Sequence, residues 1–172
     1  KLVWAIILNL FILTTRPKRV AHAYASVWDN DSPLRQIAYM QADLLQQRLD
    51  QQDFGVPVKV ELAMTYGKPA LTDALYNLKA QGIERVVVLP AYPQYSASTT
   101  AAVFDVIAKY GLKARDLPAL SFVKDYYNHP LYIAALADSV RRYQAEHGQA
   151  QKLLFSFHGI PKPYADKGDP YP

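Results

Sequence analysis

The fold is decided by one short stretch, Arg85-Val86-Val87-Val88-Leu89. Successive side chains of a strand point to opposite faces of the sheet, so a continuous apolar run is typical of a strand covered on both sides. Parallel sheets with helices on both faces provide that environment, whereas antiparallel sheets commonly leave one face in water. The stretch therefore predicts an inner strand of a parallel sheet.

Similar runs alternate with helical stretches along the rest of the chain. Further strands are predicted at residues 58–63, 119–123 and 152–157, and helices at residues 34–52, 69–81, 98–110 and 130–146. The first helix follows Ser32-Pro33, which suits an N-cap and a first helical position. This order predicts an α/β fold, an open, doubly wound parallel sheet in a three-layer, Rossmann-like α/β/α arrangement. From the length of 172 residues we expect a single domain, residues 1–172.

The composition excludes several classes of protein. The chain is 51% apolar and 20% charged, which excludes a disordered or low-complexity sequence. It has no cysteine, which excludes a disulfide scaffold, a cysteine nucleophile and thiolate metal sites. The net charge of +4 is small and the basic residues are scattered, so no nucleic-acid partner is expected. The 13 tyrosines indicate an aromatic surface with polar edges.

The opening apolar run, residues 2–13, has helical spacing. It is too short to span a bilayer, and the basic residues at positions 16, 18 and 19 argue against a signal peptide. A helix that is apolar on nearly every side is buried, docked on a partner or resting on a membrane surface. We expect burial or docking, with membrane contact as the alternative.

Four loops carry the site prediction, because ligands of such sheets bind beyond the carboxyl ends of the strands. They are residues 64–69, 90–100, 124–129 and 158–164, and together they hold a large share of the tyrosines. Aromatic loops gathered at one edge of a sheet predict a flat, apolar ligand with polar margins.

The second loop has two interpretations. In one, Ser96 or Ser98 caps the following helix and the prolines stiffen the turn. In the other, the hydroxyls of Ser96, Ser98, Thr99 and Thr100 bind a ligand's carboxylate or phosphate together with the helix N-terminus. No glycine-rich segment accompanies them, which argues against a nucleotide.

His158 directly follows the predicted strand at residues 152–157. It is either a hydrogen-bonded structural residue or, if it faces an apolar pocket, a neutral imidazole that ligates a divalent metal or accepts a proton. The other histidines, His22, His129 and His147, fall on predicted helices or helix starts, and we expect them to be solvated or capping residues.

Several of these segments resemble one protein family. Residues 89–100, Leu-Pro-Ala-Tyr-Pro-Gln-Tyr-Ser-Ala-Ser-Thr-Thr, are similar to the family segment LPLYPQYSxST. The ferrochelatase signature resembles residues 155–162, Phe-Ser-Phe-His-Gly-Ile-Pro-Lys, followed by Tyr164 and Gly168-Asp169-Pro170-Tyr171-Pro172. Further matches in order and spacing, especially to gamma-proteobacterial members, are Arg16-Pro17, Tyr24, Trp28, Ser32-Pro33-Leu34 and Tyr66-Gly67.

The resemblance implies a lyase that inserts ferrous iron into protoporphyrin IX, the last step of protoheme synthesis. It implies His158 as the metal ligand or proton acceptor. Our candidates for substrate binding are Tyr66, Tyr92, Tyr95, Ser96 and Thr99, with the three tyrosines at the wall or rim of the porphyrin site. Protoporphyrin IX and Fe²⁺ are then substrates, and no organic cofactor is expected.

The resemblance further implies that residues 1–172 correspond to the N-terminal half of a ferrochelatase. The family's first strand and its C-terminal half, which brings an acidic partner for the histidine, have no counterpart here, so we expect the isolated chain to be inactive or nearly so. Thr65 stands where many members have arginine. Two alternatives are a sirohydrochlorin-type chelatase, which uses a histidine pair, and a non-catalytic porphyrin- or anion-binding module. The implied location is the cytoplasm, with peripheral contact to the inner membrane through residues 2–13 as a further option.

Overall fold

The computed structural model describes residues 20–172. The predicted apolar helix at residues 2–13 lies outside the described residues. The chain divides into two compact units, Lys1–Leu62 and Ala63–Pro172, and each is described by itself. Within residues 20–172, no helix combines the length and the apolar character that crossing a membrane requires.

The main element of the first unit is α3 (Pro33–Asp50). It begins as predicted, with Ser32 at the N-cap and Pro33 at the first helical position. The carboxylate of Asp31 accepts hydrogen bonds from the Arg35 guanidinium at 2.7 Å and from the backbone N–H of Ser32 at 2.6 Å. A carboxylate at this end of a helix also interacts favourably with the helix dipole. Local sequence therefore sets the start of α3.

Residues 58–63, predicted as a strand, do not form one. Part of their backbone hydrogen bonding goes to Gln46 of α3 instead. Its Nε2 donates to the carbonyl oxygen of Val58 at 2.9 Å, and its Oε1 accepts from the backbone N–H of Val60 at 2.6 Å. The strand prediction is wrong here because a strand needs a neighbouring strand for its hydrogen bonds, and an apolar pattern does not show whether one is present.

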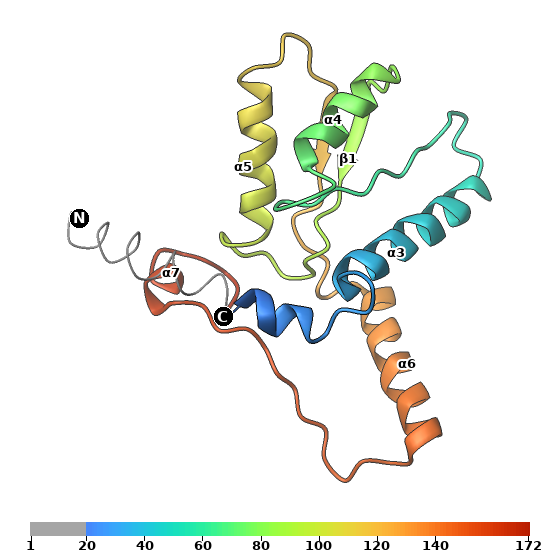
Figure 1. Cartoon of the computed structure of the whole chain (residues 1–172), viewed down its shortest axis with the longest axis vertical. Coiled ribbons are helices and arrows are strands. Elements are labelled where there is room, and N and C mark those ends of the chain that lie inside the picture. Colours follow the sequence, from blue (N-terminus) through green and yellow to red (C-terminus); the bar gives the residue numbers. More distant parts are fainter. Residues whose placement is uncertain (1–19) are drawn as a thin grey trace. The chain divides into compact units, whose positions relative to one another are not determined.

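The second unit contains a two-stranded parallel sheet, β1 (Arg85–Val88) and β2 (Ala119–Phe122). The register pairs Arg85 with Ala119 and Val88 with Phe122. Both strands lie where the sequence predicts them, and Figure 1 shows helices α4 (Leu71–Ala80) and α5 (Thr100–Gly111) beside β1. Parallel strands that alternate with helices define an α/β fold.

The covering of β1 differs from the expectation. Val86 and Val88 are half-buried, but Val87 points to the other face and is 70% exposed. The described residues therefore bury one face of β1 and leave the other open. They do not form the expected doubly wound, three-layer arrangement, since that would cover both faces.

The core of the second unit lies between α4, α5 and the sheet. It consists of Leu75, Val103, Ile107 and Tyr110, with Val88 and Leu120 of the two strands packed against it. Aromatic pairs add to this packing: the ring centroids of Tyr76 and Tyr110 are 5.0 Å apart, and those of Phe104 and Phe122 are 4.5 Å apart, both edge to face. The helical stripes predicted from sequence thus pack as expected.

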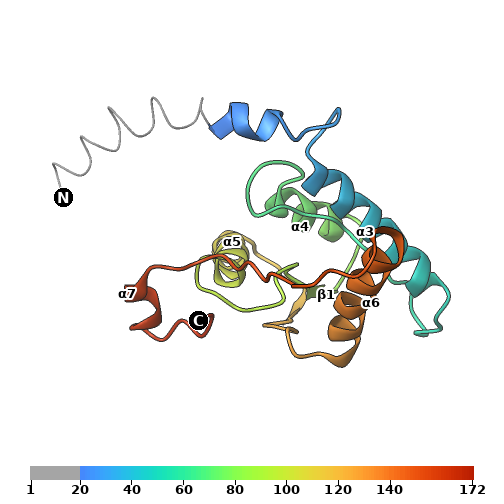
Figure 2. The same cartoon turned by 90° about the horizontal axis from the view of Figure 1, so that it is seen from below.

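After β2 come α6 (Pro130–His147) and the short α7 (Lys162–Ala165). His129 is the N-cap of α6, where its Nδ1 accepts from the backbone N–H of Leu131, so the capping role expected for it is confirmed. Residues 152–157, predicted as the fourth strand, run as irregular chain (Figure 2). Leu154 is 91% exposed, because no strand in the described residues pairs with this run. This strand prediction is also wrong for the described structure.

Candidate functional site

The loops that follow β1 and β2 meet at the carboxyl ends of the strands, as the sheet-edge rule predicts. The backbone N–H of Tyr126 donates to the carbonyl oxygen of Pro93 at 2.9 Å. The ammonium group of Lys124 lies over the ring of Tyr95, 5.3 Å from its centroid. Residues 90–100 and 124–129 therefore form one continuous edge.

The end of the chain is attached to the same edge through Asp169. One carboxylate oxygen, Oδ2, accepts from the Ser96 hydroxyl and from the backbone N–H of Ala97, both at 2.9 Å. The other, Oδ1, accepts from the backbone N–H of Tyr171 at 3.1 Å. Burial favours a raised pKa for Asp169, but the hydrogen bonds from Ala97, Ser96 and Tyr171 outweigh it and lower the pKa below its usual value. The carboxylate is therefore held in its charged form.

Ser96 and Thr99, predicted to bind substrate, shape the turn that leads into α5. Ser96 is only 2% exposed, and its hydroxyl also pairs with that of Ser98 at 2.9 Å. Thr99 is the N-cap residue of α5, and its hydroxyl donates to the Ser96 carbonyl at 3.4 Å instead of capping the helix. The hydroxyl of Thr100 is buried without a hydrogen-bond partner in the described residues. The Ser96 hydroxyl thus binds a carboxylate, as one interpretation requires, but that carboxylate is the protein's own Asp169.

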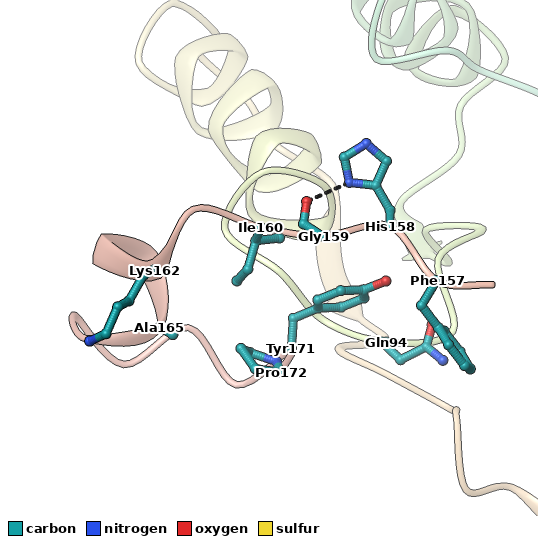
Figure 3. A pocket seen from close by; sticks show the side chains of 9 residues that line it. All are labelled: Gln94, Phe157, His158, Gly159, Ile160, Lys162, Ala165, Tyr171 and Pro172. Carbon is teal, nitrogen blue, oxygen red and sulfur yellow. Dashed lines mark hydrogen bonds between the residues drawn. The ribbon is translucent and has the colours of Figure 1, made fainter. Parts of the chain in front are cut away.

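A pocket of about 570 Å³ lies between the first of these loops and the end of the chain (Figure 3). Its volume falls in the range typical of small-molecule sites. The lining residues are Gln94, Phe157, His158, Gly159, Ile160, Lys162, Ala165, Tyr171 and Pro172. Most of this surface is apolar, and its polar side-chain groups are the Gln94 amide, the His158 imidazole and the Lys162 ammonium group. The pocket can therefore take an apolar molecule with polar substituents.

His158 is among the pocket residues, but its ring does not face an enclosed cavity. The side chain is exposed, and Figure 3 shows the imidazole pointing away from the rings of Phe157 and Tyr171. Its Nδ1 lies 2.7 Å from the carbonyl oxygen of Gly159. A carbonyl oxygen only accepts, so Nδ1 carries the proton, and in the neutral ring Nε2 keeps a free lone pair. The imidazole therefore presents Nε2 for a metal or a proton, although it lacks the apolar enclosure expected from sequence.

The tyrosines predicted for the site are placed differently from one another. Tyr95 is half-buried under Lys124, Tyr92 is 39% exposed, and Tyr66 is 79% exposed. Tyr66 belongs to a loop that closes on itself, since the N–H of Met64 donates to the carbonyl of Pro69 at 2.8 Å. Among the described residues, none of these three tyrosines lines the pocket, whose lining includes Gln94 and Tyr171 instead.

Sequence reasoning missed three residues of this region: Gln94, Asp169 and Tyr171. Asp169 stands between Gly168 and Pro170, which favour a turn, and it was named only within residues 168–172 of the segment that resembles the ferrochelatase signature. A carboxylate in such a turn, and a serine that is followed by a helix start, are complementary groups, but they lie 73 positions apart. Spacing along the chain gives no signal for that contact.

The described residues contain no cluster of three or more histidine, cysteine, aspartate or glutamate side chains able to hold a metal ion. Useful affinity for Fe²⁺ normally requires several ligands. His158 therefore supplies one ligand at most from this part of the chain, and further groups must come from the substrate or from other residues.

The described residues thus combine an α/β fold, a mostly apolar pocket at the carboxyl edge of two parallel strands, and one histidine beside that pocket. The model of the ferrochelatase family matches residues 1–172, and the chain belongs to that family.

Curated relatives support this assignment. The chain is 58% identical over all of its 172 residues to the ferrochelatase of Psychrobacter cryohalolentis, of which it covers 51%. It is 59% identical over 169 residues to the ferrochelatase of Psychrobacter sp. strain PRwf-1, covering 98% of this chain and 50% of the relative. For the Acinetobacter baumannii enzyme of strain ATCC 17978 the identity is 54% over 171 residues, 99% of this chain and 51% of the relative. The chain spans about half the length of the curated relatives it matches.

Proposed function

We propose that this chain forms the N-terminal half of a ferrochelatase, a lyase that inserts ferrous iron into protoporphyrin IX and yields protoheme. The observation that carries the proposal is the match to the family over residues 1–172, with 53–59% identity to curated members. Protoporphyrin IX and Fe²⁺ are the substrates in this proposal, and the protein acts in heme biosynthesis. The family assignment does not favour the sirohydrochlorin-type alternative.

The reaction asks the protein for a few physical tasks. Two pyrrole N–H protons must leave the macrocycle, and the incoming Fe²⁺ must lose bound water. A neutral imidazole suits either task, because it accepts a proton or ligates a borderline metal ion. In the proposal His158 performs one of them through Nε2, which the Nδ1 contact to Gly159 leaves available.

The other predicted site residues complete the proposal. In the proposal Tyr92, Tyr95 and Tyr66 contribute to the wall or rim of the porphyrin site, outside the residues that line the described pocket. Ser96 and Thr99 shape the loop that carries the first two tyrosines, which is their part in substrate binding. Walls that hold the macrocycle out of plane expose its nitrogen lone pairs and lower the barrier to metal entry.

The proposal includes a larger sheet than the described one. In the proposal, the sheet of the full-length protein has the doubly wound, three-layer form, and residues 1–172 belong to one α/β domain of it. The proposed location is the cytoplasm, with contact to the inner membrane through residues 2–13 as the option left open by sequence.

The test is metal insertion by the full-length protein. Purified protein is mixed with Fe²⁺ and protoporphyrin IX without oxygen, and the absorbance of protoheme is followed. Parallel reactions contain sirohydrochlorin. The proposal expects catalysed formation of protoheme and no acceleration with sirohydrochlorin. Metal insertion into sirohydrochlorin but not into protoporphyrin IX would contradict the proposal and favour a sirohydrochlorin-type chelatase. Binding of protoporphyrin IX without metal insertion would favour a non-catalytic binding module.

A further inference from the structure

Asp169 joins two segments that both line the pocket. Gln94 belongs to one segment, and Tyr171 and Pro172 belong to the other (Figure 3). The carboxylate of Asp169 makes hydrogen bonds to both segments. Its Oδ2 accepts from Ser96 and Ala97, two and three residues after Gln94, and its Oδ1 accepts from the N–H of Tyr171. A single carboxylate thus connects the two segments that line the pocket.

The segment that Asp169 holds has little other regular structure around it. Residues 152–161 form neither strand nor helix, and Leu154, Phe155 and Phe157 are more than two-thirds exposed. The only helix of this segment in the described residues, α7, is four residues long. Because few apolar side chains fix it, its position depends strongly on the polar contacts at Asp169.

The partners of Asp169 are suited to a permanent internal contact. Ser96 is buried, and the Ala97 amide belongs to the turn just before α5, where donors and the helix dipole favour a negative charge. Hydrogen bonds to a charged acceptor are about twice as strong as neutral ones. A substrate carboxylate that used Ser96 and Ala97 would first have to displace Asp169.

We propose that Asp169 is a positioning residue: its carboxylate fastens the segment that carries His158 and Tyr171 to the loop at Gln94, and so sets the width of the porphyrin pocket. The porphyrin part of this statement rests on the proposed function. The contact of Asp169 with the loop does not depend on that function, so the contact and its effect on porphyrin binding are measured separately.

The fastening is tested in the full-length protein by hydrogen exchange read by mass spectrometry. Asp169→Asn keeps the size of the side chain but removes its charge and one acceptor oxygen. Asp138→Asn is the matched control, since Asp138 is an exposed residue of α6 paired with Arg142. We expect Asp169→Asn to increase exchange at least about tenfold in peptides covering residues 95–98 and 168–172, because the variant weakens hydrogen bonds that now go to a charged acceptor. Unchanged exchange in both peptides would overturn the proposal.

A double-mutant comparison shows whether Ser96 and Asp169 act as one unit. Ser96→Ala removes one of the three donors, so its effect on exchange should be smaller than that of Asp169→Asn. The double variant should equal Asp169→Asn alone, because the lost contact is the same one. Fully additive effects would show that the two residues act independently, which contradicts the proposal.

The consequence for the pocket is measured by binding and kinetics. Quenching of tryptophan fluorescence gives the Kd for protoporphyrin IX, and we expect it to rise about tenfold in Asp169→Asn. The KM for porphyrin should rise in parallel, and the KM for the metal should stay within about twofold. Equal losses for both substrates would point to general destabilisation and would contradict a positioning role. If the wild-type protein fails to bind or metallate porphyrin, the proposed function fails, while hydrogen exchange still decides the fastening.

Discussion

The backbone N–H of Tyr126 donates a 2.9 Å hydrogen bond to the carbonyl oxygen of Pro93. This contact joins the loops that follow two neighbouring parallel strands, although 32 residues of chain separate Pro93 from Tyr126. Functional residues on either loop therefore depend on the same small sheet for their position.

The side chain of Tyr126 leads to a prediction about pH. Burial raises the pKa of Tyr126, and the neighbouring Tyr132 adds to the rise. The unfolded chain loses this proton first, near pH 10. The contribution of Tyr126 to stability is thus constant below about pH 10 and is lost as the pH rises through the pKa of Tyr126 in the folded protein.

We expect Tyr126→Phe to lose less stability between pH 9 and pH 11 than the wild type, measured by urea unfolding. Tyr143→Phe, at an exposed position of α6, is the control and should follow the wild type. Identical losses in all three proteins would contradict the prediction.

The core between α4, α5 and the sheet predicts a stability change. Ile107 is 2% exposed and lies in the centre of this core. Ile107→Ala should lower the free energy of unfolding by about 2–5 kcal/mol, because the lost apolar contacts leave a cavity. Leu112→Ala, at a position that is 88% exposed, should change it by about 0.5 kcal/mol or less. Urea unfolding of the full-length variants measures both values, and a similar change in the two variants would show that α5 is not packed as described.

The isolated chain of 172 residues should metallate porphyrin poorly or not at all. Its described residues offer His158 without a cluster of further metal ligands. We expect less than about 1% of the turnover of the full-length protein, because general acid–base catalysis and ligand positioning each contribute factors of roughly 100 or more. Zinc insertion into protoporphyrin, followed by fluorescence, measures this. Turnover near that of the full-length protein would show that the site is complete within these residues.

Elements that depend on contacts close in the sequence were predicted better than elements that depend on distant partners. The bounds of helices α3, α4, α5 and α6 agree with the predicted ones to within about two residues. A helix is fixed by neighbours three and four positions away and by local signals at its start, such as Pro33 at the first position of α3 and the His129 cap of α6. β1 and β2 were also predicted, and they form because each of the two apolar runs pairs with the other through backbone hydrogen bonds. Residues 58–63 and 152–157 have the same apolar character but no paired strand in the described structure.

The site shows the same division. The meeting of the loops at Pro93 and Tyr126 follows from the sheet-edge rule, and His158 was placed beside the pocket by its position after an apolar run. The direction of the imidazole and the contact from Asp169 to Ser96 were not predictable. They depend on backbone dihedral angles and on a contact across 73 positions, and neither leaves a periodic pattern in the sequence.

The most direct test of the account is the rate of ferrous iron insertion into protoporphyrin IX by the full-length His158→Ala variant. The matched control is His147→Ala, since His147 is exposed at the end of α6, where it contacts the Tyr143 carbonyl and ring and the Glu146 carboxylate of its own helix. The account predicts that His158→Ala lowers the rate by roughly 100-fold or more while far-UV circular dichroism stays unchanged, and that His147→Ala retains the wild-type rate. A His158→Ala protein that inserts iron at the wild-type rate would contradict the account.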